Sequence, residues 1–314
     1  IIDRQEIVNG SFDRKGNVLS QTVTNKDASN NVLSSSEITN SNFNSKGTPK
    51  NITRINKDNT GVVIERQEIA NTFDAKGNVT FQTIDTFDNI GSTAAKLGRV
   101  EITNSNFDAR GNPGTVRRVN KDELGNTIDI QDILNKSFDA RGNILSQTVT
   151  TFDANGFTKL GIVDITNSNI DFKGNVGFSV RVNKDANGLT IDRQEITGKK
   201  FDSLGNVLEQ TVVTKDAAGN VLGSVDIYNS NYTPKGQPRF TTRINKDAAG
   251  NAIDRQEIAN QAFDKKGNVT SQRIVNKDAA GSTTLTITDI TNENFNSKGN
   301  PTRVTRVNMD GFGA

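Results

Sequence analysis

The feature that most constrains this chain is an internal repeat. The string RQEI at residues 4–7 returns at residues 66–69, 193–196 and 255–258, and a diverged copy, QDI, lies at residues 131–133. The acidic residue of this string therefore recurs every 62 to 64 positions. A fixed period of this length is typical of repeat architectures, in which each unit is stabilised by its neighbours.

A second string lies about halfway between these copies. EITNSNF at residues 37–43 is followed by versions that begin at Glu101, Asp164, Asp226 and Asp289, with the same period. The unit of roughly 63 residues is thus a pair of half-repeats of about 31 residues. We predict one array whose five units are residues 1–62, 63–126, 127–189, 190–251 and 252–314.

The two ends of the chain match each other within the repeat. Residues 310–314 align with residues 247–251, and residues 1–4 align with residues 252–255, so the end of the chain runs in frame into its start. Neither end carries an atypical polar capping repeat. We therefore expect these residues to be a whole-number window of a longer array.

Each half-repeat contains two strings with strong turn chemistry. Examples of the first are FDRKGNV at residues 12–18 and FDARGNI at residues 138–144, and KDAAGN at residues 215–220 and 246–251 exemplifies the second. The Asp side chain binds backbone N–H groups ahead of it and the Gly accepts positive φ, which indicates a type I turn closed by a G1 bulge. The turn glycines include Gly16, Gly77, Gly142, Gly205, Gly219, Gly250 and Gly267.

The segments between turns indicate strands. VLSQTVT at residues 18–24 and TTLTIT at residues 283–288 are rich in Val, Thr, Leu and Ile and show no helical apolar stripe. One strand every 15 to 16 residues gives about four strands per unit. The sequence predicts an elongated all-β fold, either an antiparallel β meander or a β-solenoid; the hairpin turns favour the meander.

One aromatic or large apolar residue stands at the same place in every half-repeat. Equivalent residues of successive repeats lie in rows, so we expect these side chains to form an apolar structural seam. The seam residues are Phe12, Phe43, Phe73, Phe107, Phe138, Ile170, Phe201, Tyr232, Phe263 and Phe295.

Repeated charges need partners if they stack. We expect one series of acids to alternate across strands with one series of arginines. The acids are Asp3, Glu65, Asp129, Asp192 and Asp254. The arginines are Arg54, Arg118, Arg181, Arg243 and Arg306.

Composition narrows the function classes. The chain has no Cys, His or Trp, which removes disulfides, thiolate nucleophiles, histidine bases and most transition-metal sites, so we predict no enzyme activity and no cofactor. The 38 Lys and Arg residues nearly balance 36 Asp and Glu residues, which disfavours nucleic acid as a partner. Apolar residues make up only 32% of the chain, so the core is thin, and no stretch is apolar enough to predict membrane insertion.

One string has the spacing of a calcium loop. Asn183, Asp185 and Asn187 place oxygen-bearing side chains at alternate positions before a glycine. Most sister turns carry Ala at the third of these positions, so structural Asx-turns are the favoured interpretation and a weak metal site is the alternative.

The turn strings resemble a known family. FDAKGNV at residues 73–79 and FDSLGNV at residues 201–207 resemble the YD repeats of the Rhs family of bacterial cell-surface and toxin-shell proteins, with Phe in place of the Tyr. The resemblance covers all ten half-repeats. It implies an exported β-strand array, which in known members forms a spiralling sheet around a cargo or a long surface stalk.

These observations favour a non-enzymatic, extracellular or cell-surface structural protein that forms a filament, stalk or matrix fibre. Its partners would be further copies or a continuation of the same array. The alternative is an adhesin or binding module that presents a repetitive polar face to glycans or proteins.

Overall fold

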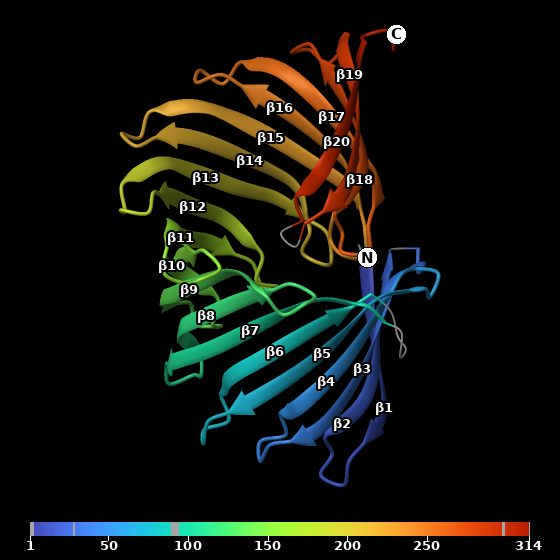
Figure 1. The fold of residues 1–314 in the computed structure, drawn as a ribbon, viewed down its shortest axis with the longest axis vertical. Coiled ribbons are helices and arrows are strands. Elements are labelled where there is room, and N and C mark those ends of the chain that lie inside the picture. Colours follow the sequence, from blue (N-terminus) through green and yellow to red (C-terminus); the bar gives the residue numbers. More distant parts are fainter. Residues whose placement is uncertain (1–2, 28, 89–93, 297–298, 314) are drawn as a thin grey trace. The chain divides into compact units, whose positions relative to one another are not determined.

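The computed structural model describes residues 3–27, 29–88, 94–296 and 299–313 as β-strands joined by turns (Figure 1). These residues include no helix, and hence none that could cross a membrane. The chain forms two compact units. Unit 1 is Ile1–Asn135 with Thr151–Lys159, and unit 2 is Lys136–Thr150 with Leu160–Ala314. The division falls inside the third sequence unit.

Unit 1 holds the first strands of the array. These are β1 (Asp3–Phe12), β2 (Val18–Asp27), β3 (Val32–Phe43), β4 (Pro49–Lys57), β5 (Val63–Phe73), β6 (Val79–Phe87), β7 (Lys96–Phe107), β8 (Pro113–Lys121) and most of β9 (Thr127–Phe138). Each strand pairs antiparallel with the next one in the sequence, from β1–β2 to β8–β9.

Unit 2 repeats this arrangement. It holds most of β10 (Ile144–Phe152), then β11 (Lys159–Ile170), β12 (Val176–Lys184), β13 (Thr190–Phe201), β14 (Val207–Asp216), β15 (Val221–Tyr232), β16 (Pro238–Lys246), β17 (Ala252–Phe263), β18 (Val269–Lys277), β19 (Thr284–Phe295) and β20 (Pro301–Asp310). Antiparallel pairs again join sequence neighbours, from β11–β12 to β19–β20.

These pairings confirm the all-β antiparallel meander and decide against the solenoid. A solenoid strand would pair with its counterpart in the next coil, about one unit away in sequence. Within unit 1 and within unit 2, each described pairing instead joins strands that are neighbours in the sequence. The described residues form twenty strands of 9 to 12 residues each, and this number agrees with the prediction of about four strands per 63 residues.

The turns have the predicted chemistry. Asp13 Oδ1 accepts hydrogen bonds from the backbone N–H groups of Lys15 and Asn17 at 2.8 and 2.9 Å. Gly16 N–H donates to the Asp13 carbonyl oxygen at 3.1 Å, and Gly16 has φ +86°, where a side chain would be strained. Positive φ values also occur at Gly77, Gly142, Gly205, Gly219, Gly250 and Gly267.

The two half-repeats end their strands differently. At the end of β3, Asn42 adopts a left-handed conformation, φ 55°, and the register continues unbroken to the pair Phe43–Pro49. At the end of β5 the register instead shifts by a bulge before the pair Phe73–Val79. Pro49 is the first residue of β4. Because Pro has no N–H to donate to a neighbouring strand, the start of a strand is one of the few places in a sheet where it is tolerated.

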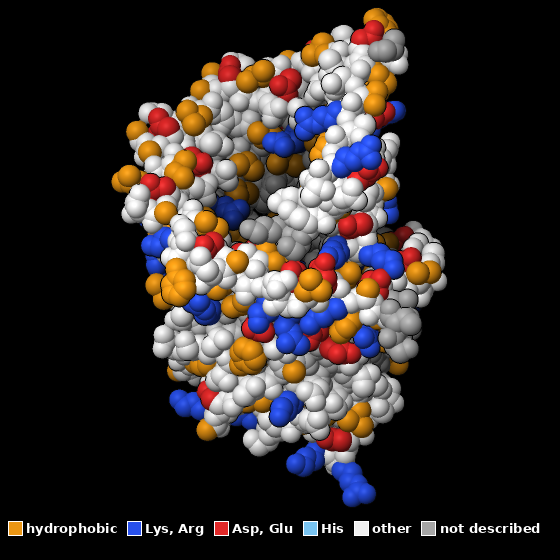
Figure 2. Space-filling view, viewed as in Figure 1, with side chains coloured by type: hydrophobic (Ala, Val, Ile, Leu, Met, Phe, Trp, Pro, Cys, Tyr) orange, Lys and Arg blue, Asp and Glu red, His pale blue; other side chains and the backbone are white. Residues whose placement is uncertain are grey.

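The core is as thin as the composition suggests. Of the hydrophobic side chains that the structure describes, only Ile130 is buried, at 8% exposure. Nine of the ten predicted seam residues are half-buried at strand ends, and Phe12, on the first strand, is 55% exposed. Figure 2 shows charged and hydrophobic side chains interspersed over the face in view. Stability must therefore come from contacts between neighbouring strands.

Candidate functional site

A ladder of ion pairs recurs along both units. A carboxylate on one strand binds the lysine 20 residues later, near the end of the next strand. The pairs, with their Nζ–O distances, are Glu6–Lys26 (2.7 Å), Glu101–Lys121 (2.6 Å), Asp164–Lys184 (2.6 Å), Glu195–Lys215 (2.8 Å), Asp226–Lys246 (2.6 Å) and Glu257–Lys277 (2.9 Å), together with Glu37–Lys57. We call these pairs the lysine ladder.

Contacts in the lysine ladder lower the pKa values of several carboxylates. The hydrogen bond from Lys184, with a second one from the Thr148 hydroxyl, brings the pKa of Asp164 to about 2. The hydrogen bonds from Lys215 and Lys277 likewise lower the pKa values of Glu195 and Glu257. These carboxylates stay ionised at neutral pH, so they act as fixed charges.

The predicted alternation of acids with arginines takes another form. Asn120 donates to Asp129 Oδ1 at 2.6 Å, and Arg118 Nε donates to Asn120 Oδ1 at 3.0 Å, so the asparagine stands between the arginine and the acid. Asn183–Asp192 and Asn245–Asp254 repeat the first of these bonds at 2.6 Å. The acid binds the asparagine and not the arginine because the strand register places the asparagine directly opposite the acid on the neighbouring strand.

A second periodic feature is an asparagine ladder. Near the end of most odd-numbered strands, an asparagine Nδ2 donates to the carbonyl oxygen of the first residue of the preceding strand, where backbone pairing has stopped. The donors and acceptors are Asn40–Val18, Asn71–Pro49, Asn104–Val79, Asn135–Pro113, Asn167–Ile144, Asn229–Val207, Asn260–Pro238 and Asn292–Val269, at 2.9 to 3.1 Å. The side chain thus satisfies a backbone acceptor that the strand cannot.

One strand lacks this asparagine. Gly198 holds the position in β13, and a Cβ there would lie 2.7 Å from the Phe201 Cζ atom and 3.0 Å from the Val176 carbonyl oxygen. The Phe201 ring therefore occupies the space that the asparagine fills elsewhere. Asparagine three residues after the recurring acid was a visible signal of this ladder, which the sequence analysis missed.

The lysine ladder is interrupted in the second sequence unit. Glu68 on β5 is the equivalent of Glu257, but Phe87 stands where Lys277 would be. Arg66 Nη1 binds Glu68 Oε1 at 3.1 Å, and its guanidinium lies over the Phe87 ring, 4.4 Å from the centroid. Phe152 makes the same replacement in the third sequence unit.

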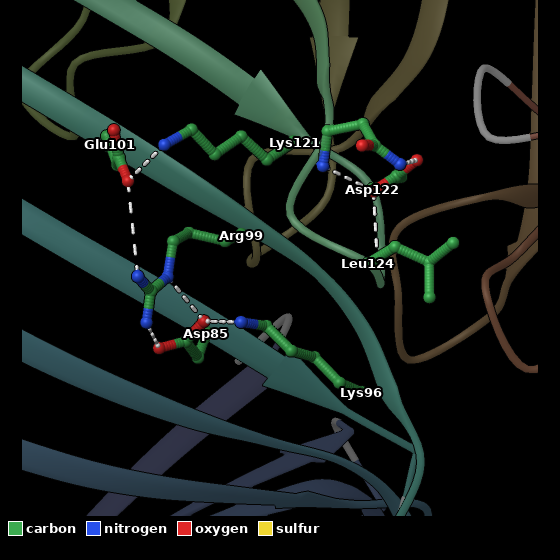
Figure 3. Close-up of polar contacts among 8 residues, drawn as sticks. Asp85, Lys96, Arg99, Glu101, Lys121, Asp122 and Leu124 are labelled. Atoms are coloured by element: carbon green, nitrogen blue, oxygen red, sulfur yellow. Dashed lines mark hydrogen bonds and ion pairs between the residues drawn. The ribbon is translucent and has the colours of Figure 1, made fainter.

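Next to this interruption, Asp85 forms a charged cluster with β7 (Figure 3). Arg99 donates through Nε and Nη2 to the two Asp85 oxygens at 2.8 and 2.7 Å, and Lys96 Nζ lies 2.6 Å from Oδ1. Hydrogen bonding from Arg99 lowers the pKa of Asp85, and the bond to Asp85 raises that of Arg99. Glu101 continues the cluster to Lys121 on β8.

An open hollow of about 330 Å³ lies beside this cluster. Thr53, Glu68, Asp85 and Arg99 are register partners on β4 to β7, so they form one row across the sheet. Ala70 and Thr83 are paired in the adjacent row, and both are short. The hollow is lined by Asn51, Ile52, Thr53, Glu68, Ile69, Ala70, Thr83, Asp85 and Arg99.

Two of the three side chains of the weak calcium candidate, those of Asn183 and Asp185, make other contacts. Asn183 donates to Asp192, as described above. Asp185 Oδ1 accepts the backbone N–H groups of Asn187 and Leu189, both at 2.9 Å, which is the Asx-turn pattern. Among the described residues, no group of three or more Asp and Glu side chains is placed to hold a metal ion.

Comparisons with known proteins add little. No family model and no curated protein matches the chain. The solved structures that match include three at 11% identity. They are TcdB2-TccC3 (TM-score 0.17, 94% of this chain, 20% of that chain), the Photorhabdus luminescens Tc holotoxin pore (0.14, 92% and 21%) and TcdB2-TccC3-Cdc42 (0.15, 97% and 24%). The chain spans a quarter or less of these chains, and TM-scores this low do not establish a shared fold.

Proposed function

We propose that this chain is a non-enzymatic structural repeat protein of the cell exterior, which builds a filament, stalk or matrix fibre. The observation that supports this most is the repetition of the same contacts from strand to strand. The lysine ladder and the asparagine ladder both join adjacent strands, so each sequence unit is stabilised by the units next to it. An array of this kind sets its length by the number of repeats.

The strands β1 and β20 expose apolar side chains that a strand from another copy of the chain would cover. Among the described residues, β1 pairs only with β2 and β20 pairs only with β19. Ile7 on β1 and Val304 on β20 are 56% and 46% exposed. The β16–β17 register pairs Thr241 with Ile258, the repeat equivalents of Val304 and Ile7, so one further β1-type strand would cover Val304.

The titrating groups support a non-catalytic function. Every described Asp or Glu whose pKa is shifted has a lowered value, as at Glu6, Asp85 and Asp226, where lysine or arginine binds the carboxylate. General acids need raised pKa values to hold a proton near neutral pH. Assays for glycosidase and protease activity should therefore give no turnover, and reproducible turnover that Asp85→Asn abolishes would contradict this part of the proposal.

The extracellular location rests on the resemblance of the turn strings to YD repeats of bacterial surface proteins. Immunogold labelling of intact and permeabilised source cells tests it. Label on intact cells is the expected result. Label that appears only after permeabilisation would contradict it.

Self-association of the 314-residue chain tests the structural function. Negative-stain electron microscopy of the concentrated chain should show end-to-end strings. Val304→Lys with Val307→Lys should abolish them without lowering the melting temperature, because like charges on an edge strand oppose pairing. Leu285→Lys is the matched control, since Leu285 is 51% exposed but lies on the inner strand β19. Strings that persist in the double variant would contradict edge pairing.

A binding module is the second candidate function. The observation that favours it is the hollow between β4 and β7, at a place where the lysine ladder is interrupted. A purely structural array gives no reason for such a departure.

A further inference from the structure

We propose that the hollow between β4 and β7 binds a neutral polyhydroxylated ligand, namely a hexopyranose unit of a glycan. The proposal rests on the binding-module function and assigns it a site and a ligand class. It does not depend on whether the array forms fibres.

The shape of the hollow suits one small ring. Its volume of about 330 Å³ is near the lower end of the ~300–1,000 Å³ usual for small-molecule sites. Ala70 and Thr83 form its low point because they are short register partners, while Glu68 and Asp85 stand beside them in the next row. At the equivalent place on β17 and β18, Ala259 pairs with Arg273, which is far longer than Thr83, whereas on β13 and β14 Thr197 pairs with Thr211.

The polar groups around the hollow suit hydroxyls. Glu68 is 48% exposed, and its ion pair to Arg66 uses Oε1. Asp85 is 15% exposed and is held by Arg99 and Lys96, so its position is fixed before any ligand arrives. A sugar hydroxyl both donates and accepts, which matches a row that presents carboxylate oxygens next to guanidinium N–H groups and threonine hydroxyls.

The charge around the hollow favours a neutral ligand. Three carboxylates, Glu68, Asp85 and Glu101, face four cations, Arg66, Lys96, Arg99 and Lys121. These groups are paired with one another, so the net field is small. Neither an anionic nor a strongly cationic ligand gains a large Coulomb attraction here.

The position of the hollow in the repeat gives independent support. Where Asp85 stands, the equivalent residues of the other four sequence units are Thr24, Thr150, Val213 and Val275. The exchange of a lysine for Phe87 and the gain of Asp85 occur two residues apart on one strand. Together they free Glu68 from the lysine ladder and place a second carboxylate beside it.

Saturation-transfer NMR on the full 314-residue chain tests the proposal. The probes are the methyl glycosides of glucose, galactose and mannose at millimolar concentration, with glucuronic acid and glucosamine as charged counterparts. The expected result is saturation transfer to at least one neutral glycoside and weaker transfer to its charged counterparts. Transfer to none of the neutral glycosides, or stronger transfer to a charged one, would overturn the proposal.

Two variants locate the site. Ala70→Phe fills the hollow at an exposed position and should weaken binding by ~10-fold or more, and Thr83→Val removes one hydroxyl and should weaken it by ~2- to 10-fold. Ala259→Phe is the matched control at the equivalent place in unit 2. Melting temperatures close to that of the wild type verify that the variants fold.

The variants also distinguish failure of the hollow as the binding site from failure of the binding-module function. Binding that survives Ala70→Phe would place the sugar elsewhere, so the hollow would fail as the site while the binding-module function stands. If no probe binds the wild type, and a printed array of neutral and anionic oligosaccharides also shows no binding, the glycan-binding function itself fails. Loss of binding in Ala70→Phe but not in Ala259→Phe supports the proposal.

Discussion

Two regions with the same strand plan, β5–β7 and β17–β19, differ in a few side chains and in what their surfaces offer. In β17–β19, Lys277 binds Glu257 at 2.9 Å and Arg273 binds Asp289 through two bonds of 2.7 Å. In β5–β7 the residues equivalent to Lys277 and Arg273 are Phe87 and Thr83. A repeat can thus keep its backbone while a few exchanges turn a salt-bridged surface into a hollow.

The backbone itself is maintained by features that both regions share. Asn71 and Asn260 make the same bond to a proline carbonyl oxygen, at 3.1 and 2.9 Å. Phe73 and Phe263 both close a strand opposite a valine. Changes at shared features should therefore cost the same in both regions, and changes at the divergent positions should not.

The largest effect should come from the seam. Phe73→Ala and Phe263→Ala should each lower the free energy of unfolding by ~2 kcal/mol, less than the ~3–5 kcal/mol for a fully buried Phe because both rings are half-buried. Urea denaturation measures this. Costs that differ by more than ~1 kcal/mol between the two variants would show that the seam is not equivalent in the two regions.

The next effect should distinguish the regions. Asp85→Ala leaves Arg99 and Lys96 beside each other without their shared carboxylate, which is 15% exposed, and should cost ~2 kcal/mol. Asp289→Ala removes a partner of Arg273 at a site that is 36% exposed and should cost ~0.5–1 kcal/mol. Equal costs in urea denaturation would remove the energetic distinction between the two clusters.

The asparagine ladder should give a smaller, shared effect. Asn71→Ala and Asn260→Ala each leave a backbone carbonyl without its side-chain donor and should cost ~1–2 kcal/mol. Thermal denaturation of both variants checks this. Because Gly198 already lacks the asparagine in β13, Gly198→Ala serves as a contrast: its added Cβ would meet Phe201 and the Val176 carbonyl, so it should destabilise by crowding.

The smallest effect concerns pH. Hydrogen bonding from Lys277 lowers the pKa of Glu257, so this pair stabilises the fold above the unfolded-state pKa of ~4.3, and the contribution is lost as the pH falls through the folded-state value. Lys277→Met should therefore cost ~0.5 kcal/mol at pH 7 and almost nothing at pH 2. A cost that is unchanged between these two pH values would show that the pair contributes packing and not charge.

The turns and strands were predictable because their chemistry is local. Asp13 and Gly16 lie three residues apart, so their turn follows from the conformational preferences of those two residues. The choice between meander and solenoid was not fixed by local chemistry alone, since it depends on which strand edges meet.

The charge partners were harder to predict because they depend on register. The lysine of each ladder pair follows its acid by 20 residues in the sequence, which is a visible signal. A series of arginines also recurs once in every sequence unit, however, so two sets of cations could have been the partners of the acids. A shift of one residue exchanges the faces of a strand, so spacing alone cannot choose between the two series. In the structure, Asn120 stands opposite Asp129 and takes the contact that was expected of Arg118.

The hollow could not be predicted from the repeat alone. It requires short side chains at Ala70 and Thr83 on paired strands, together with Asp85 in the neighbouring row. Ala70 and Thr83 are not unusual by themselves, and although Asp85 departs from the repeat, the sequence does not show which residues adjoin it. Only the register shows that they adjoin.

Electron microscopy of native material from the source organism tests the central claim most directly. The account predicts uniform fibres or stalks, labelled by an antibody to the 314-residue chain, in which a reconstruction shows consecutive antiparallel strands ~4.8 Å apart and a period of four strands per unit. Labelled material that consists only of dispersed single molecules would contradict the structural function.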